Sequence, residues 1–378
     1  MPDQRTSPRE RLHAATRPGR GLIPIATTPE IQSLISSGSP VAIGVSGGKD
    51  SQAAALATFE ALNDVGHDGP RVLIHSDLGS VEWSASLDVC RELAAFLGAE
   101  LIVVRRDRGD LMDRWESRWQ SSITRYQDLS TVTLVPCWST PSLRFCTSEL
   151  KTQIIGAELK RRFCTTTIIS VSGVRRAESS RRARAPIADP DRNGRIWSWR
   201  PILDWSETDV FAYIAARGLE PHPAYRCYGM TRVSCRFCIM SSLADLSAAT
   251  RQPETHDLYR RMVALEISSS FAFQGSRWLG DVAPDLLGRR QRRELAEAKT
   301  RASLRQHAER RIVPTMLYVR GWPRRMLTDD EADILAGVRH EISDLFGFRS
   351  NCLDRAGVHA RYAELLELRA AREGRAAR

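Results

Sequence analysis

The sequence predicts an α/β fold in which a mostly parallel, doubly wound sheet is covered by helices. Two observations predict it: short apolar runs alternate with segments of helical spacing, and a glycine-rich turn joins the first such run to the first helix. Strands that alternate with helices are typical of parallel sheets whose faces are covered. The predicted strands are residues 40–45, 71–76, 101–104 and 166–172.

Each predicted helix has its own boundary signals. Residues 52–65 are followed by Gly66, and the next two helices cover 82–97 and about 148–162. Ser206-Glu-Thr-Asp209 reads as a capping box before the apolar residues of a fourth helix. Those apolar residues and the terminating glycine are Val210, Phe211, Ile214 and Gly218.

The chain divides in sequence order into three parts. Residues 1–20 are expected to be a disordered basic tail, 21–245 a nucleotide-binding domain with a Cys-rich loop, and 246–378 a helical C-terminal region. Within the second part, residues 107–145 interrupt the alternation and are expected to be an insertion over the site. This insertion mixes Arg114, Arg118 and Arg125 with Trp115, Trp119, Tyr126 and Trp138. Such a mixture is found on nucleic-acid surfaces but also in cores.

Composition favours a cytoplasmic globular protein without a membrane partner. Hydrophobic residues make up 42% and charged residues 26%, and no apolar run approaches a membrane span. The start of the sequence lacks the apolar segment of a secretory signal. The net charge of +10 suits a polyanionic partner. However, only four of the 55 basic residues are lysines, so the excess of arginine also fits a bias of genome composition.

The loop Ser46-Gly47-Gly48-Lys49-Asp50-Ser51 between a strand and a helix predicts a phosphate site. Glycines let backbone N–H groups turn toward an anion, and the helix adds its positive end. Ser46 and Ser51 can donate to phosphate oxygens, and Lys49 adds charge. Asp50 suggests a bound Mg²⁺ ion or a structural bond to the loop. For the loop as a whole, an ordinary glycine-rich turn is the plainer alternative.

This loop resembles the Ser-Gly-Gly-x-Asp-Ser motif of the PP-loop family, the adenine nucleotide alpha hydrolases. The resemblance implies that the loop binds the pyrophosphate of ATP and that the end of the second strand lies against adenosine. The residues at that position are His75, Ser76, Asp77 and Leu78.

Two further segments resemble phosphoadenosine phosphosulfate (PAPS) reductases and their relatives. They are Val171–Ser179, which reads VSGVRRAES, and Arg200–Val210, which reads RPILDWSETDV. Arg175 and Arg176 follow the carboxyl end of a strand, where open α/β sheets bind ligands, and could clamp phosphate or sulfate. A solvated basic loop is the alternative reading.

Clustered cysteines in a cytosolic chain suggest a metal or redox site. Cys235 and Cys238 form a CxxC, Cys227 precedes them in the loop 222–240, and Cys146 lies before a predicted helix. Four thiolates suit a [4Fe–4S] cluster or Zn²⁺, and a redox dithiol is a third option. Cys137 could compete with Cys146.

The cysteine pattern resembles the PAPS-reductase-like subunit of bacterial DNA phosphorothioation systems. That resemblance implies a [4Fe–4S] cluster on Cys146, Cys227, Cys235 and Cys238. Sulfonucleotide reductases carry a catalytic cysteine in a Glu-Cys-Gly-x-His setting, which this sequence lacks. The pattern therefore favours the relatives that use ATP.

The sequence thus predicts an ATP pyrophosphatase that adenylates a nucleic acid backbone oxygen for sulfur incorporation. Lys49 and Asp50 are the predicted catalytic residues, with Mg²⁺ sharing the charge of the leaving pyrophosphate. DNA and a cysteine desulfurase or other modification subunits are the expected partners. A sulfonucleotide reductase is the first alternative, and a non-catalytic, nucleotide-sensing DNA-binding subunit is the second.

Overall fold

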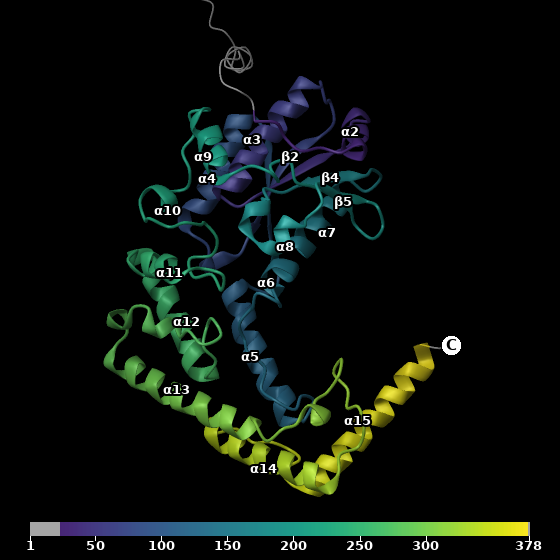
Figure 1. Cartoon of the computed structure of the whole chain (residues 1–378), viewed down its shortest axis with the longest axis vertical. Coiled ribbons are helices and arrows are strands. Elements are labelled where there is room, and N and C mark those ends of the chain that lie inside the picture. Colours follow the sequence, from purple (N-terminus) through teal and green to yellow (C-terminus); the bar gives the residue numbers. More distant parts are fainter. Residues whose placement is uncertain (1–22, 377–378) are drawn as a thin grey trace, which may run out of the picture. The chain divides into compact units, whose positions relative to one another are not determined.

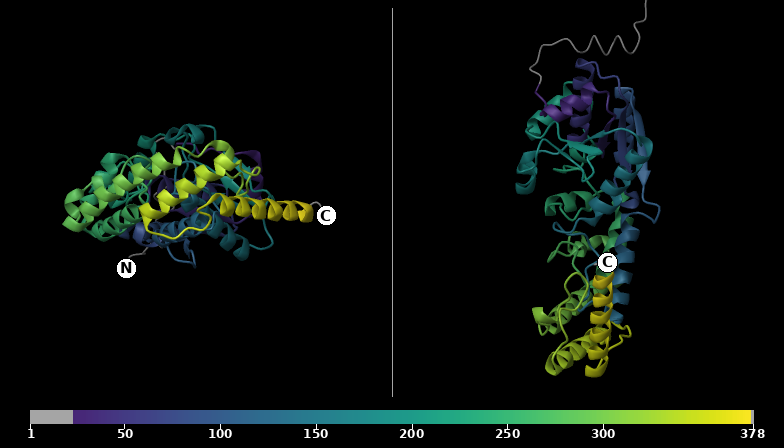
Figure 2. Two further views of the ribbon diagram at one scale, coloured as in Figure 1. Left: turned by 90° about the horizontal axis from the view of Figure 1, so that it is seen from below. Right: turned by 90° about the vertical axis from the view of Figure 1, so that its right-hand side faces the viewer.

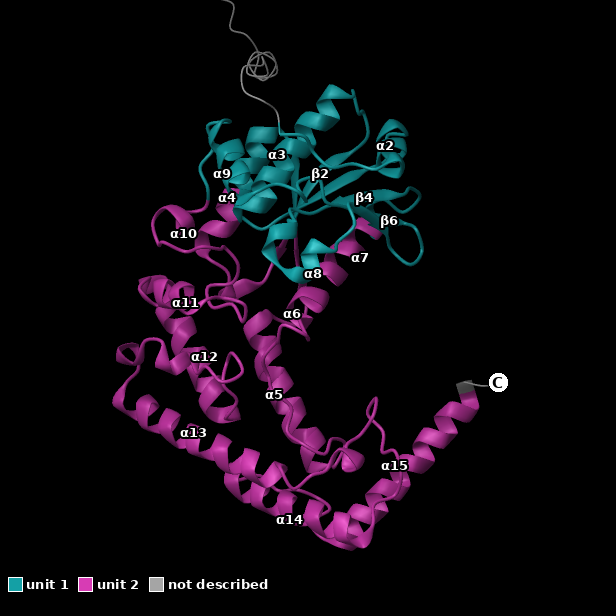
Figure 3. Cartoon of the chain, viewed as in Figure 1, with its two compact units in different colours: residues 1–74, 90–102, 161–221 teal, residues 75–89, 103–160, 222–378 magenta. Residues whose placement is uncertain are grey.

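The computed structural model describes residues 23–376 (Figure 1). The predicted disordered tail, residues 1–20, lies outside the described residues. The chain forms two compact units that alternate along the sequence (Figure 3). Unit 1 consists of the segment up to Ile74, Cys90–Ile102 and Arg161–Pro221. Unit 2 consists of His75–Val89, Val103–Lys160 and His222–Arg378.

A six-stranded sheet has the order β3-β2-β1-β4-β6-β5. Its strands are β1 Val41–Val45, β2 Arg71–Asp77, β3 Glu100–Arg105, β4 Ile168–Val171, β5 Ala188–Pro190 and β6 Ile196–Trp199. Strand β4 pairs in parallel with both β1 and β6, and β5 pairs antiparallel with β6. The predicted α/β fold with a mostly parallel sheet is confirmed. The β5–β6 hairpin was not predicted, because Ala-Asp-Pro has neither apolar alternation nor β-branched residues.

The core of unit 1 lies between the sheet and its helices. Residues 41–43 of β1 are fully buried, as expected for a strand covered on both faces. Helix α3 (Lys49–Asp64) packs on β1 and on α9 (Glu207–Ala215), and its five residues 53–57 are all buried. Four of these five are alanines, whose small side chains allow close approach of the helix to the sheet. The other helices of unit 1 are α2 (Pro29–Ser36) and α8 (Ser180–Ala183).

Helix α9 confirms the predicted capping box. The Ser206 hydroxyl accepts from the Asp209 amide at 3.1 Å, and the Asp209 carboxylate accepts from the Ser206 amide at 2.8 Å. Val210 and Ile214 are buried, and Gly218 has a φ of +69°, a conformation that glycine adopts without strain. The cap fixes where α9 begins and therefore where Glu207 lies.

Two helices bridge the unit boundaries and the rest belong to unit 2. The bridging helices are α4 (Ser84–Leu97) and α7 (Gln153–Arg162). Unit 2 contains α5 (Leu111–Gln127), α6 (Phe145–Thr147), α10 (Pro223–Arg226), α11 (Leu243–Thr250), α12 (His256–Ser269), α13 (Arg289–Glu309), α14 (Asp329–Phe346) and α15 (Arg355–Ala376). Helix α13 packs against α12 and α14, and α14 packs against α15 (Figures 1 and 2). No helix among residues 23–376 has the length and apolar character needed to cross a membrane.

The aromatic residues of 107–145 form the core of unit 2. Trp115, Trp119, Tyr126 and Trp138 are each at most 3% exposed. Trp138 meets Trp115 and Phe273 edge to face, with ring centroids 5.3 and 5.1 Å apart. The reading of these rings as a nucleic-acid surface is therefore wrong. The segment contains α5, whose buried face supplies much of this core.

Candidate nucleotide-binding site and cysteine group

The loop after β1 has the predicted strand–loop–helix geometry. Gly47 has a φ of +75°, and Gly48 is the residue before the first turn of α3. The Ser51 hydroxyl donates to the Gly48 carbonyl at 2.8 Å and accepts from the Ser46 amide at 3.2 Å. These bonds curl the loop over the start of α3, where the first backbone N–H groups have no acceptor within the helix. The arrangement can receive an anion such as a phosphate.

The carboxyl end of β4 approaches this loop very closely. A Cβ atom added at Gly173 would lie 2.2 Å from the Asp50 carbonyl oxygen and 2.7 Å from the Ser51 nitrogen. Only glycine therefore fits at this position. The close approach leads the chain directly to Arg175, whose Nε donates to Asp50 Oδ1 at 2.5 Å. Asp50 is thus paired with a residue outside the loop, and its two predicted roles, in holding Mg²⁺ or in a structural bond to the loop, remain predictions.

Lys49 lies between two carboxylates. Its Nζ is 3.1 Å from Glu207 Oε1 and 3.5 Å from Asp50 Oδ2, and the residue is 3% exposed. The same ammonium lies 5.7 Å from the centre of the Phe211 ring. Lys49 and Arg175 place two buried positive charges beside the loop, balanced by Asp50 and by the more exposed Glu207.

The other predicted nucleotide-binding residues have different surroundings. Arg176 donates to Asp204 and to the carbonyls of Ala183 and Ala185, so its guanidinium holds the loop after η3 (Arg176–Glu178). Within unit 2, buried His75 lies 3.1 Å from Glu82, and the Ser76 hydroxyl donates to the Leu150 carbonyl.

Asp77 Oδ1 accepts from the Gly79 amide at 2.7 Å, and its other oxygen is 3.8 Å from Arg105. The residues His75, Ser76 and Asp77 form the end of β2, as predicted. The nucleotide-binding and catalytic roles of all these residues remain predictions.

Three of the four predicted cluster cysteines, Cys146, Cys235 and Cys238, lie close enough for their charges to interact. Burial raises the pKa of the Cys235 thiol, and the adjacent Cys238 thiol raises it further, whereas Lys151 lowers it. Cys146 contributes a weaker effect of the same sign as Cys238. Cys227, at the end of α10, is exposed.

The thiols suit a cluster chemically but do not converge in this structure. Within the described ranges, no three His, Cys, Asp or Glu side chains are arranged as metal ligands. Cys90 and Cys137 are buried, and burial raises the pKa of Cys137 to about 12.

Sequence reasoning missed two residues of the loop's surroundings. Gly173 was part of a quoted motif, but nothing local indicated its contact with Asp50. Glu207 was read only as part of the cap of α9, although it also pairs with Lys49. Its position one residue after the cap, in the segment that resembles PAPS reductases, was the available signal.

Comparison with known proteins identifies the family. Residues 40–241 match the family model for the phosphoadenosine phosphosulfate reductase domain. A protein of Escherichia phage 186, described as an uncharacterized 37.8 kDa protein, is 30% identical over 253 residues, which are 56% of this chain and 71% of that protein. An adenosine 5'-phosphosulfate reductase of Neisseria meningitidis serogroup B is 38% identical over 68 residues. Those residues are 18% of this chain and 27% of the reductase.

Among solved structures, the PAPS reductase from Candida auris in a phosphate complex is 15% identical to this chain, with a TM-score of 0.35. The alignment covers 56% of this chain and 97% of that one. The family assignment rests on the sequence match, which spans more than half of the chain and includes the phosphate loop, Arg175 and the CxxC pair. The protein belongs to the phosphoadenosine phosphosulfate reductase domain family.

Proposed function

We propose that the protein is an ATP pyrophosphatase that activates a nucleic acid backbone oxygen for replacement by sulfur. The observation that supports it most is the strand–loop–helix turn at Ser46–Ser51, with Lys49 and Arg175 buried beside it. In the proposed step a backbone phosphate oxygen attacks the α-phosphorus of ATP. The bond between that phosphorus and the bridging oxygen breaks, pyrophosphate leaves, and a sulfur nucleophile then displaces AMP.

The residues of unit 1 have distinct parts in this proposal. The loop amides and Lys49 would stabilise the charge that develops on the leaving pyrophosphate. Asp50 would orient Arg175 toward the phosphates through their 2.5 Å bond. Mg²⁺, when bound, would neutralise part of the phosphate charge. For Lys49 to contact phosphate it has to turn from Glu207, whose side chain is 56% exposed and can move aside.

The cysteine group and the partners belong to the same proposal. Cys146, Cys227, Cys235 and Cys238 would hold a [4Fe–4S] cluster, which supplies electron or sulfur chemistry when bound. Zn²⁺ is the alternative and would be structural. DNA would be the substrate, and a cysteine desulfurase or other modification subunits would be the partners. The net charge of +10 supports a polyanionic substrate.

Labelled ATP tests the proposed reaction. We expect AMP and pyrophosphate, formed slowly by the protein alone. Lys49→Ala should lower turnover more than ATP affinity, because the lost charge matters most as the leaving group departs. Lys160→Ala, on α7, is the matched control and should retain turnover. Release of ADP and phosphate would refute the proposal.

Metal analysis of anaerobically purified protein tests the cluster. We expect about four iron and four sulfide per chain, by cluster stoichiometry. Cys235→Ser should lose the metal, whereas Cys90→Ser, which changes a buried thiol of unit 1, should keep it. One zinc per chain with no sulfide would establish the structural-metal alternative.

The second candidate is reductive cleavage of a sulfonucleotide. It is supported by the family match and by the similarity of 68 residues to an adenosine 5'-phosphosulfate reductase. Incubation with PAPS or adenosine phosphosulfate and a thiol reductant distinguishes the reductase from the ATP pyrophosphatase. Sulfite release that needs no ATP would favour the reductase, and its absence alongside pyrophosphate release from ATP would favour the first proposal.

A further inference from the structure

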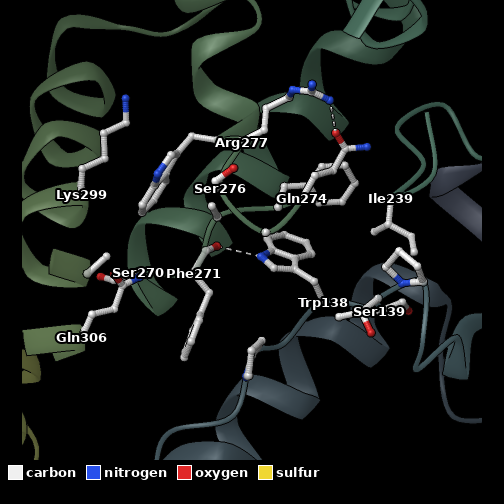
Figure 4. A pocket seen from close by; sticks show the side chains of 18 of the residues that line it. Trp138, Ser139, Ile239, Ser270, Phe271, Gln274, Ser276, Arg277, Lys299 and Gln306 are labelled. Carbon is white, nitrogen blue, oxygen red and sulfur yellow. Dashed lines mark hydrogen bonds between the residues drawn. The ribbon is translucent and has the colours of Figure 1, made fainter. Parts of the chain in front are cut away.

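A pocket of about 760 Å³ lies in unit 2 (Figure 4). Its walls come from residues 136–141, from the loop that follows α12, and from the second half of α13. The volume falls within the range of sites that bind small organic molecules. All of its lining residues belong to unit 2, whereas the phosphate loop belongs to unit 1.

Aromatic rings form part of the pocket wall. Phe271 and Trp278 line the pocket and are only half-buried. The Arg305 guanidinium already lies over the Phe271 ring, 4.0 Å from its centre, whereas the Lys299 ammonium is 5.9 Å from the centre of the Trp278 ring. Trp138 and Phe273 are buried beside them and fix the wall, since Trp138 Nε1 donates to the Phe271 carbonyl at 2.8 Å (Figure 4). The half-buried Trp278 ring therefore suits stacking with a planar aromatic group.

The charged lining residues are all basic. They are Arg277, Lys299 and Arg305, and no Asp or Glu of the described residues lines the pocket. Lys299 and Arg305 pair with Asp281 and Glu309, which lie outside the lining. The exposed Arg277 donates to the neutral Gln274 side chain at 2.7 Å (Figure 4), and no ion pair to it occurs among residues 23–376. The charge of Arg277 therefore favours an anionic ligand.

The start of α13 carries further arginines, of which Arg290 and Arg293 pair with Glu294 and Glu297 of the next turn. Four of its first five residues are arginines, Arg289, Arg290, Arg292 and Arg293, and none of its first turn is acidic. Cations at a helix N-terminus oppose the helix dipole, so an anion bound there would relieve an unfavourable arrangement. Lys299 follows Arg293 by six residues, which corresponds to about 9 Å along a helix. The arginines and the pocket-lining residues of α13 therefore belong to one helix and are separated along its axis by about two turns.

We infer that this pocket binds one nucleotide of a single-stranded nucleic acid. The base stacks on Trp278, its phosphate contacts Arg277 and Lys299, and neighbouring phosphates follow the arginines of α13. Aromatic stacking combined with a basic track is how proteins bind single strands without reading sequence. The inference shares with the proposed function only the class of substrate, a nucleic acid.

Fluorescence anisotropy with a labelled twelve-nucleotide thymidine strand, without ATP, tests the inference on the full chain. Trp278→Ala should weaken binding about tenfold, in line with the usual contribution of a stacked base. Trp278→Phe should largely restore it, because a ring remains. Arg277→Glu should also weaken binding, whereas Arg324→Glu, the same change at an exposed arginine outside the pocket, should have a smaller effect.

Several outcomes would overturn the inference. One is equal binding by Trp278→Ala and the unchanged protein, and another is equal loss in Arg277→Glu and Arg324→Glu. A third is that free thymidine monophosphate competes as strongly as an unlabelled strand when both are counted per nucleotide. That result would assign the pocket to a free nucleotide instead. Because no ATP is present, failure here is separate from failure of the proposed pyrophosphatase reaction.

Discussion

Lys49 shares its charge between the phosphate loop and helix α9. Its ammonium lies 3.1 Å from Glu207, whose side chain is 56% exposed, and 3.5 Å from Asp50. An incoming phosphate therefore competes with a carboxylate for the same ammonium and is also repelled by that carboxylate. In the proposed function, the position of Glu207 would therefore set how strongly the loop holds ATP.

We therefore predict that Glu207→Gln tightens ATP binding. Removal of one exposed carboxylate should lower the dissociation constant about two- to fivefold, because such pairs are worth roughly 0.2–1 kcal/mol. Glu100→Gln, which removes an exposed carboxylate paired with Arg162, is the control and should leave affinity unchanged. Calorimetric titration measures both. Weaker binding by Glu207→Gln would mean that Glu207 assists the nucleotide, for example by holding Mg²⁺.

Residues whose role depends on local sequence were predictable, and residues whose role depends on distant contacts were not. The glycines and serines of the loop form a turn that the sequence itself specifies. The bond between Arg175 and Asp50 and the close approach at Gly173 join segments far apart in the sequence. Nothing beside either segment encodes its partner.

At the scale of elements, a buried arginine joins helix α14 to the end of α5. Arg339 is fully buried, and its guanidinium donates to the carbonyls of Tyr126, Gln127, Asn351 and Cys352. Two of these carbonyls lie at the end of α5 and two in the loop at 351–352, and those of Tyr126 and Gln127 also accept from the amides of Leu129 and Asn351. The planar guanidinium offers five donors in a fixed geometry, which a lysine cannot reproduce.

Arg339→Lys should therefore destabilise the protein. We expect a loss of roughly 2–4 kcal/mol in the free energy of unfolding, because buried carbonyls would lose their donors. Arg324→Lys, an exposed position in unit 2, should change it by less than about 0.5 kcal/mol. Urea unfolding followed by tryptophan fluorescence measures both. Equal stability of the two variants would show that water replaces the guanidinium at these carbonyls.

A second buried ionisable side chain, Glu266, fixes the loop after α12. Glu266 is fully buried, and its carboxylate accepts from the amides of Phe273, Leu279 and Gly280 at 2.7–3.0 Å. Burial nevertheless raises the pKa of this carboxyl to about 7, from an ordinary value of 4.5, and the three amides only partly oppose that rise. The neutral form is therefore favoured in the folded protein up to near neutral pH.

This raised pKa predicts a pH dependence of stability. The contribution of Glu266 is fully present below about pH 4.5 and is lost as the pH rises through about 7, because the unfolded chain ionises first. The loss is on the order of 3 kcal/mol. We expect the free energy of unfolding of the unchanged protein, measured at pH 5 and at pH 7.5, to fall relative to that of Glu266→Gln as the pH rises. The control Glu297→Gln changes an exposed residue and should be as stable as the unchanged protein at both pH values. A difference in stability between Glu266→Gln and the unchanged protein that is the same at both pH values would contradict the prediction.

Elements were predictable where an apolar run or a cap marked them. Strands β1, β2 and β4 are buried apolar runs, and α9 carries a complete capping box. Strand β5 exists only because it pairs with β6, and its three residues carry no strand signal. The segment 107–145 was interpreted as an insertion over the site, although the residues of α5 that are buried at 115, 119, 122 and 126, three of them aromatic, recur with helical spacing.

At the scale of the whole molecule, the two units interleave along the chain. The sequence suggested a boundary at residue 245, after the last family motif. Unit 2, however, combines residues 75–89 and 103–160 with everything from His222 onward. Long-range packing of aromatic residues makes this unit: Trp119 meets Phe271, and Trp115 and Trp138 both meet Phe273. No local pattern in the sequence indicates which distant segment will cover a given apolar face.

This interleaving predicts that a chain truncated after residue 245 does not fold correctly. The truncation removes α12–α14, which supply much of the core around Trp115, Trp119 and Trp138. Large exposed aromatic surfaces cause association, so the truncated chain should aggregate or bind a hydrophobic dye. A chain that ends after residue 370 loses only the exposed end of α15 and should unfold like the full chain. Size-exclusion chromatography and thermal unfolding distinguish the two. A monomeric chain 1–245 with a cooperative transition would instead mean that the family region is an independent domain, because its tryptophans would then be covered without α12.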